Sequence, residues 1–153
     1  MVDESCVFCR IIGGEEMVSI VHEDDRAVAF MDIHPTGPGH TLVVSRDHYA
    51  TLFDAPEDLA THCLRVAKKI APAIQRAIGA ESVNIFAPNG KDGGQEVAHF
   101  HLHILPVRPE IEIEGEEEFL SALEAEVPTR PELDIMAARI SRAIQDTNQT
   151  ELQ

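Results

Sequence analysis

The stretch "AHFHLHILP" (residues 98–106) holds three of the chain's eight histidines, each separated from the next by one apolar residue. Neighbouring side chains of a β-strand point to opposite faces, so His99, His101 and His103 are expected to share one face. The alternating positions carry apolar side chains: Ala98, Phe100, Leu102 and Ile104. The pattern predicts a strand over 97–106 whose apolar face packs on a core and whose histidine face is available for chemistry.

The histidine row has three interpretations. The plainest is a row of solvated or hydrogen-bonded histidines. A zinc site is the second, although imidazoles spaced at about 6.6 Å along a strand converge poorly on one ion. The third is covalent phosphoryl chemistry, in which the middle imidazole attacks phosphorus and its neighbours hold phosphate oxygens and move a proton. The Gly-rich stretch "NGKDGG" (89–94) favours the third, because its backbone N–H groups can cradle an anion.

The segments before the row predict further strands. Residues 18–32 are expected to form two strands around an Asp-rich turn, 41–45 a third and 82–88 a fourth. With 97–106 as the fifth, and helices between and after the strands, the chain is expected to adopt an α+β fold built on a mainly antiparallel sheet.

A long helix is expected between the third and fourth strands. Asp54 is the predicted N-cap, Glu57 completes a capping box, and Gly79 ends the helix. Pro72 is expected to kink or divide it. Its apolar residues recur at helical spacing: Leu59, Cys63, Val66, Ile70, Ile74 and Ile78.

Beyond Pro106 the sequence becomes strongly acidic. A short helix is expected over 116–126 and a longer one over 131–147. The stripe of the longer helix is Leu133, Met136, Ile140 and Ile144. We therefore divide the chain into a domain of residues 1–106 and an acidic, helical extension of residues 107–153, packed on or near that domain.

The charge restricts the partners of the protein. The chain has 27 acidic against 12 basic residues and a formal net charge of −15, which disfavours bulk nucleic-acid or anionic-membrane binding. No apolar run reaches the roughly 18 residues of a membrane span, and the N-terminus lacks signal-peptide features, so we expect a cytoplasmic protein. The acidity fits either a salt-rich cytoplasm or an ordinary acidic protein. Three cysteines argue against a disulfide framework, and Cys63 is expected in the core.

Three stretches together resemble the histidine triad (HIT) family: "CVFCRIIGGE" (6–15), "VHEDDRAVAFMDIHPTGPGHTLVVSRDHY" (21–49) and "GGQEVAHFHLHILP" (93–106). The resemblance covers about residues 6–106. It implies a HIT-like fold with a five-stranded sheet, one long helix and a short N-terminal helix. It also implies a homodimer whose two sheets join into one of ten strands.

The resemblance further implies a nucleotide hydrolase or nucleotidyl transferase that acts at an α-phosphate. The triad consists of His99, His101 and His103, and His101 in the middle would be the nucleophile. His103 and His40 of "PGH" would hold the phosphate or handle protons. The implied substrates are a nucleoside phosphoramidate or a dinucleoside polyphosphate, with a purine base of the adenosine type.

The same resemblance assigns the nucleotide pocket. Backbone at Gly94 and Gln95, with the side chain of Gln95 or Glu96, would line the phosphate, and Asp32 would bind ribose unless it only forms a turn. The base pocket would be formed by apolar residues that are equally compatible with plain core packing: Phe8, Ile11, Phe30, Ile33 and Leu42. Pro88 replaces the family's polar amide before "NG", which leaves a nucleotide-binding scaffold dimer with little turnover as the alternative.

The resemblance also implies a structural zinc, held by Cys6, Cys9, His48 and His99, with no catalytic metal required. Two thiolates and two imidazoles suit tetrahedral zinc. An unligated cysteine pair is the alternative, and a metallohydrolase that uses all three triad histidines is a further hypothesis. The remaining histidines match no motif and are expected on the surface: His22, His34 and His62.

Overall fold

The computed structural model of the chain describes residues 3–107 and 127–150. Five strands form one sheet in the order β1-β2-β3-β5-β4, and all neighbouring strands are antiparallel. The strands are β1 (Ile20–Glu23), β2 (Ala27–Met31), β3 (Thr41–Ser45), β4 (Ser82–Phe86) and β5 (His101–Val107). The predicted α+β fold with a five-stranded antiparallel sheet is confirmed.

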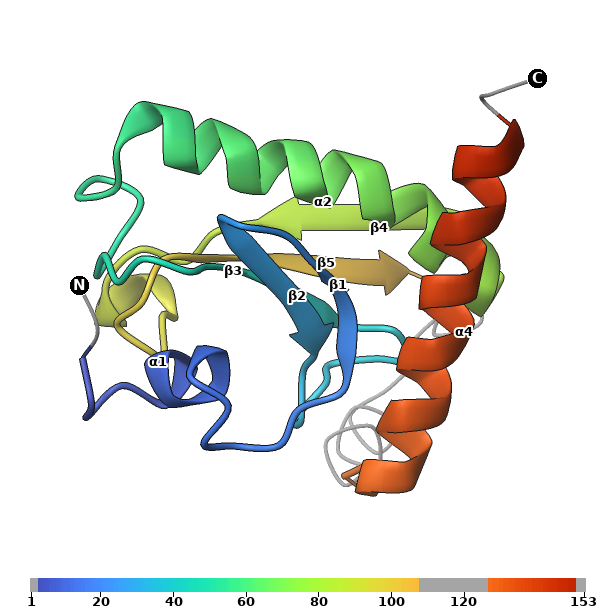
Figure 1. The fold of residues 1–153 in the computed structure, drawn as a ribbon, viewed down its shortest axis with the longest axis horizontal. Helices are drawn as coiled ribbons and strands as arrows, with labels where there is room; N and C mark the ends of the chain where they lie inside the picture. Colours follow the sequence, from blue (N-terminus) through green and yellow to red (C-terminus); the bar gives the residue numbers. More distant parts are fainter. Residues whose placement is uncertain (1–2, 108–126, 151–153) are drawn as a thin grey trace, which may run out of the picture.

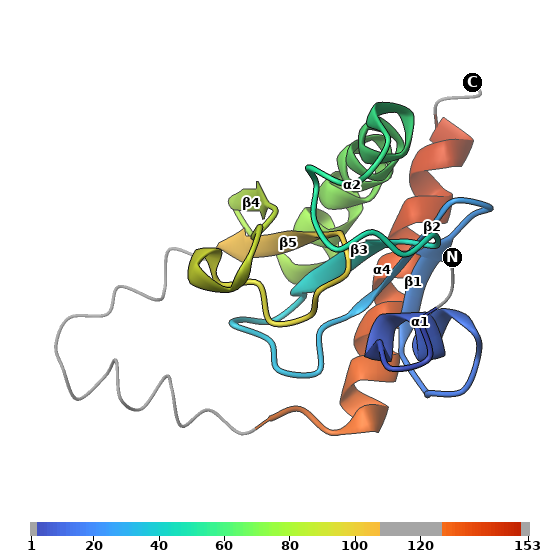
Figure 2. The same ribbon diagram turned by 90° about the vertical axis from the view of Figure 1, so that its left-hand side faces the viewer.

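Helices cover both faces of this sheet (Figures 1 and 2). They are the short α1 (Val7–Ile12), the long α2 (Glu57–Ile78) and the C-terminal α4 (Arg130–Thr150), with a single 3₁₀ turn at Lys91–Gly93. Alternate residues of β2 enter two separate cores, which explains why the whole strand is buried: Ala27, Ala29 and Met31 face α2 and α4, whereas Val28 and Phe30 face α1. No helix of the described residues has the length and apolar character needed to cross a membrane.

The strand prediction for the histidine row is correct only from His101 onward. Leu102 and Ile104 belong to the core under α2, and His101 and His103 lie on the opposite face, as alternation requires. The backbone bends before the strand: the N–H of His99 donates to the carbonyl of Val97 at 2.8 Å. His99 therefore lies outside the strand, which is shorter than predicted, although its ring still lies on the α1 side with that of His101, each edge-on to Phe8.

The long helix differs from its prediction at the N-terminus. Asp54 is not its N-cap, because the helix begins at Glu57 after Pro56. Asp54 instead accepts hydrogen bonds from the backbone N–H and hydroxyl of Thr51. Pro72 does not divide the helix, since its position is exposed and water can satisfy the carbonyl that loses a partner. Gly79 ends the helix in the left-handed conformation, with φ of 71°.

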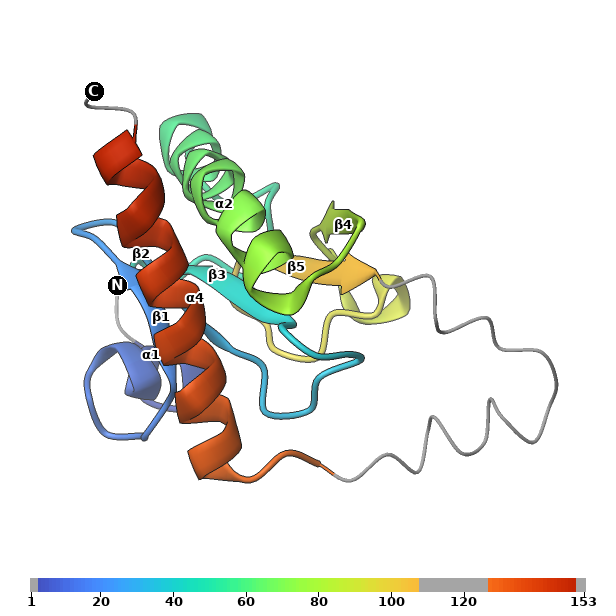
Figure 3. The same cartoon turned by 90° about the vertical axis from the view of Figure 1, so that its right-hand side faces the viewer.

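The C-terminal helix packs beside α2 and across β1 (Figure 3). Leu133, Ile140 and Ile144 are buried and Met136 packs against the same core, which confirms the predicted stripe. Polar contacts add to this packing, since Ser19 donates to Asp134 at 2.6 Å and Ser141 donates to the carbonyl of Val21 at 2.8 Å. The short helix expected over 116–126 lies outside the described residues.

Candidate functional site

Three histidines are connected on the face of the sheet that α1 partly covers. His101 and His103 come from β5, and His40 directly precedes the paired strand β3. His40 Nε2 lies 2.8 Å from His103 Nδ1, and His103 Nε2 lies 3.1 Å from His101 Nε2. The structure therefore brings together the three histidines that the sequence assigned to phosphate chemistry.

Backbone groups at both ends of this chain determine which nitrogens carry protons. The N–H of Thr36 contacts His40 Nδ1 at 3.1 Å and can only donate, so the proton of neutral His40 lies on Nε2. His40 then donates to His103 Nδ1, and His103 donates from Nε2 to His101 Nε2. At the other end His101 Nδ1–H donates to the carbonyl of His99 at 2.6 Å. Both ends lead to the same assignment: His101 Nε2 presents a lone pair.

Burial keeps these imidazoles neutral. Desolvation lowers the pKa of His40 and of His101. Desolvation, followed by the nearby His101 and His40, lowers the pKa of His103 to about 4. Two aromatic rings fix the geometry, since Phe86 stacks on His103 with centroids 4.8 Å apart and Phe8 meets His101 edge-on at 5.2 Å. A neutral imidazole with an oriented lone pair can act as a nucleophile near pH 7.

Asp32 lies at the edge of this group and has two contacts. Its Oδ1 accepts from the backbone N–H of His34 at 2.9 Å, so it does form a turn. Its Oδ2 lies 3.6 Å from His40 Nε2 and so points toward the histidines. Asp32, His40 and His103 also offer atoms within 4.8 Å of one another, the spacing of a possible metal site. In this structure, however, His40 Nε2 and His103 Nδ1 lie 2.8 Å apart, which is the distance of a direct N–H···N hydrogen bond.

His99 belongs to a second cluster with Cys6, Cys9 and His48. Its Nδ1 lies 3.4 Å from Cys6 Sγ and 3.7 Å from Cys9 Sγ, and His48 Nδ1 lies 3.3 Å from Cys9 Sγ. The four ligand atoms all lie within 4.8 Å of one another. Tetrahedral zinc, with Zn–S of about 2.3 Å and Zn–N of about 2.0–2.1 Å, requires S···N separations of about 3.6 Å. The donors and their spacing thus fit zinc.

The outer nitrogen of His99 is also held as in a metal site. His99 Nε2–H donates to the carbonyl of Ser45 at 2.7 Å, which leaves the Nδ1 lone pair directed at the thiols. Burial lowers the pKa of His99 to about 4, so this nitrogen is unprotonated near neutral pH. Within the described residues no metal-ligand group joins His99 to His101 and His103. The ligand atoms of His99 are thus directed at the thiols and not at His101 and His103, so this geometry does not favour a metallohydrolase built on all three triad histidines.

The Gly-rich loop borders a cavity of about 640 Å³, lined by Ala50, Thr51, Gly90, Lys91, Gly94, Gln95, Glu96 and Ala98. The side chain of Gln95 is engaged in holding this loop. Its amide donates to the carbonyls of Ala50 at 2.7 Å and Val97 at 2.9 Å, and its Oε1 accepts from the N–H of Gly90 at 2.7 Å. Gly94, with φ of 84°, and Glu96 are exposed beside it.

Most of the apolar residues expected around a base are core residues. Phe8, Phe30 and Leu42 are buried in the cluster under α1, and Ile11 packs against it. Ile33 differs, because 47% of its surface is exposed on the loop that carries Asp32 and His40. Of the five residues, Ile33 has the most surface to offer a ligand.

Some site residues were not expected from the sequence. Phe86 lies opposite His103 in the β4–β5 register, which only the strand pairing reveals. Thr36 acts through its backbone N–H, which no residue type signals. His34 is exposed as expected, but the expectation for His22 and His62 is wrong. Both are half-buried around Asp24, with His62 Nε2 at 2.9 Å and His22 Nε2 at 3.9 Å from its carboxylate.

Comparison with known sequences agrees with the resemblance to the HIT family. A family model described as the HIT domain matches residues 14–110. A HIT-like protein of Saccharolobus solfataricus is 42% identical over 101 residues, which cover 66% of this chain and 73% of that protein. Adenosine 5'-monophosphoramidase HNT1 of Saccharomyces cerevisiae is 37% identical over 108 residues, which cover 71% of this chain and 66% of that protein.

Solved structures agree in fold. A HIT-like protein from Bartonella henselae, described as involved in cell-cycle regulation, has a TM-score of 0.80 at 30% identity, with 94% of this chain and 99% of that chain covered. A zinc-bound histidine triad family protein from Mycobacterium smegmatis has a TM-score of 0.78 at 28% identity, with 95% and 97% covered. The similarity to these structures includes the C-terminal helix, since both cover more than nine tenths of this chain.

Proposed function

The chain belongs to the HIT domain family, and on this premise we propose that it is a nucleotide hydrolase or nucleotidyl transferase with a covalent nucleotidyl-His101 intermediate. The observation that carries the proposal is the orientation of His101. Its Nδ1–H is held by the His99 carbonyl at 2.6 Å, so Nε2 carries the lone pair, which would attack phosphorus once the substrate displaces the hydrogen bond from His103. HNT1, the yeast relative, is named as an adenosine 5'-monophosphoramidase, which supports the same class of reaction.

The reaction balances in two displacements. His101 Nε2 attacks the α-phosphorus, a P–N bond forms, and the bond to the leaving group breaks as that group takes a proton from water. His103 Nε2–H, released from its hydrogen bond to His101, would donate a hydrogen bond to a phosphate oxygen. Water then attacks the α-phosphorus, loses a proton to solvent, and the P–N bond to His101 breaks as the nucleotide leaves. His40 donates to His103 Nδ1 and so sets which nitrogen of His103 carries the exchangeable proton.

The pocket residues have proposed roles that follow from their contacts. Because the Gln95 side chain is engaged by the loop, the phosphate would be held by backbone N–H groups near Gly94, with Glu96 at the exposed rim. Asp32 would accept hydrogen bonds from ribose through Oδ2. Ile33 would contact the base, and a shell of largely buried residues would support it: Phe8, Ile11, Phe30 and Leu42.

The substrate we propose is an adenosine phosphoramidate, with a dinucleoside polyphosphate as the second candidate. Product analysis on a panel of both classes distinguishes them. His101→Ala should abolish turnover, and wild-type protein quenched during turnover should carry a nucleotidyl adduct on His101 by mass spectrometry. His34→Ala, an exposed histidine of the neighbouring loop, is the matched control. Tight nucleotide binding without turnover by the wild type would instead establish the scaffold alternative.

We also propose a structural zinc at Cys6, Cys9, His48 and His99. The S···N distances of 3.3–3.7 Å and the hydrogen bond from His99 to Ser45 support it, as does the zinc-bound relative from Mycobacterium smegmatis. When bound, zinc would tie α1 to the loop that follows β3 and to the segment just before β5. The histidine site itself requires no metal in this scheme.

A homodimer through β4 is the assembly we propose. The opposite edge of the sheet, β1, is packed against α4, whereas β4 pairs only with β5 among the described strands. Ile85 and Phe86 of β4 are 40% and 43% exposed, which is costly for an edge strand left in water. Ile85→Lys should convert the dimer to monomer in sedimentation velocity. Leu64→Lys, on the exposed face of α2, should not.

For domain organisation we propose that residues 1–106 carry the site and that residues 107–153 form an extension. The described part of the extension, α4, buries Leu133, Ala137, Ile140 and Ile144 in the core under α2. Its removal would uncover that core. We therefore expect a chain truncated after residue 106 to lose stability.

A further inference from the structure

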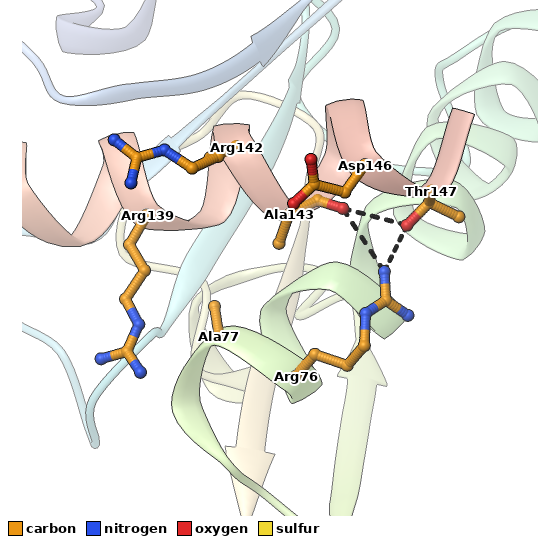
Figure 4. A pocket seen from close by; sticks show the side chains of 7 residues that line it. All are labelled: Arg76, Ala77, Arg139, Arg142, Ala143, Asp146 and Thr147. Carbon is orange, nitrogen blue, oxygen red and sulfur yellow. Dashed lines mark hydrogen bonds between the residues drawn. The ribbon is translucent and has the colours of Figure 1, made fainter. Parts of the chain in front are cut away.

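A second cavity lies away from the histidines, between the C-terminal part of α2 and the C-terminal half of α4 (Figure 4). Its volume is about 500 Å³, within the usual range of about 300–1,000 Å³ for small-molecule sites. Its lining residues are Arg76, Ala77, Arg139, Arg142, Ala143, Asp146 and Thr147. We call this cavity the arginine hollow. It has no part in the function proposed above.

The charge of the hollow is opposite to that of the protein. The chain has only 12 basic residues against 27 acidic ones, yet three arginines and one acidic residue line this cavity. Grouping like charges costs electrostatic free energy unless something neutralises them. An acidic protein that collects guanidinium groups at one place creates a local positive field that its net charge does not reveal.

The three arginines differ in their contacts. Arg76 of α2 donates to the Thr147 hydroxyl and, at 3.4 Å, to the carbonyl of Ala143, so it is held in place across the helix pair. Arg139 and Arg142 of α4 have no ion pair or hydrogen bond within residues 3–107 and 127–147. Figure 4 shows both side chains at the end of the hollow away from Arg76, with Arg139 extending toward α2 and Arg142 extending from the other side of α4. Two guanidinium groups are thus available for a ligand.

We propose that the arginine hollow binds the phosphate groups of a small di- or triphosphate anion. Planar guanidinium groups bind phosphate oxygens through paired, charge-assisted hydrogen bonds. Arg139 would make these bonds from the side of α4 that faces α2, the exposed Arg142 would turn toward the same ligand, and Arg76 would add its charge from the other end of the hollow. The net charge of −15 repels polyanionic polymers at long range, which favours a small ligand that the local field can hold.

Calorimetric titration with inorganic tripolyphosphate, at constant ionic strength, tests the proposal. The double variant Arg139→Gln/Arg142→Gln should weaken binding by about tenfold or more, because each guanidinium contributes charge-assisted hydrogen bonds. Arg65→Gln/Lys68→Gln removes the same charge from the exposed face of α2 outside the hollow and should leave affinity within about twofold. Circular dichroism and melting temperature confirm that both variants fold.

Amide chemical shifts then locate the ligand and separate its sources. Tripolyphosphate should shift Ala77, Ala143 and Thr147. If ATP shifts the same amides, the ligand of the arginine hollow is a nucleoside polyphosphate. If ATP shifts only amides near His101, the ligand of the hollow is a free polyphosphate. The proposal is overturned by any of three results: no binding, tripolyphosphate shifts confined to the Gly-rich loop, or equal weakening in the two double variants.

Discussion

The two halves of the histidine row show how one residue type acquires two chemistries within five positions. His99 faces two thiols and a second imidazole, whereas His101 faces an imidazole and a backbone carbonyl. The cause is local backbone geometry. Both rings lie edge-on to Phe8 of α1, but the bend before the strand brings only His99 to the cysteines, whereas the regular strand that starts at His101 places His101 beside His103. Equal spacing in sequence therefore does not imply equal function.

The two halves are nevertheless coupled through one residue. The ring of His99 faces Cys6 and Cys9, while its carbonyl accepts the Nδ1–H of His101. Whatever fixes the ring of His99 also fixes the acceptor that orients the proposed nucleophile. The cysteine cluster is thus expected to support the reaction without touching the substrate.

The largest expected effect is a loss of turnover when His101, on the β5 half of the histidine row, is replaced. His101→Ala should lower kcat by at least about 10³-fold, because it removes the proposed nucleophile. Urea unfolding should show that the variant remains folded, since the cluster of Cys6, Cys9, His48 and His99 and the rest of α1 keep their own contacts. Steady-state kinetics on an adenosine phosphoramidate measures the effect. A loss below tenfold would end the assignment of His101 as nucleophile.

The cysteine half should respond in metal content and stability. Cys6→Ala removes one of four proposed ligands and should lower zinc affinity by more than about 100-fold, since even an outer partner is worth 10–100-fold. The melting temperature should fall by about 5–10 °C. Zinc per chain by atomic absorption is the direct measurement. Cys63→Ala, from the core under α2, should keep its zinc, and equal zinc loss in both variants would contradict the proposal.

The sequence predicts the fold well where periodicity decides it. The stripe of α4 and the alternation of β5 depend on which side chains meet a core, and both are visible in the residue pattern. Backbone-determined features are not visible. The bend at Val97–His99 and the Thr36 N–H that orients His40 involve main-chain groups common to most residues. The late start of α2 has a different origin, because the Asp54 carboxylate accepts hydrogen bonds from Thr51 instead of capping the helix.

The loop that carries His40 offers a sharper test of that backbone control. A Cβ on Gly39 would lie 2.6 Å from Ile78 Cγ1, and its φ is +83°. Gly14 has a similar φ of +80° but open space around it. Gly39→Ala should cost about 2–4 kcal/mol in urea unfolding, from strain plus overpacking, and Gly14→Ala only about 1–2 kcal/mol. Turnover should fall only in Gly39→Ala, because His40 follows directly.

The smallest effect expected is the pH dependence of stability from His103. Its folded pKa is lowered from the usual 6.5 to about 4, mainly by burial. Between these values the unfolded chain binds a proton that the folded chain does not, so stability is present above pH 6.5 and is lost as pH falls toward 4. In His103→Gln the slope of unfolding free energy over this range should decrease by up to roughly one proton.

Urea titrations at several pH values between 4 and 7.5 measure this slope. His34→Gln is the control, because His34 is exposed and its replacement should leave the slope unchanged. His40 and His101 also have lowered pKa values and continue to contribute in both variants. An unchanged slope in His103→Gln would mean that its ring is solvated in the folded protein. His101 and His103 would then lack the low-polarity surroundings that keep their imidazoles neutral. The assignment of a neutral His103 that donates a hydrogen bond to His101 Nε2 would fail with it.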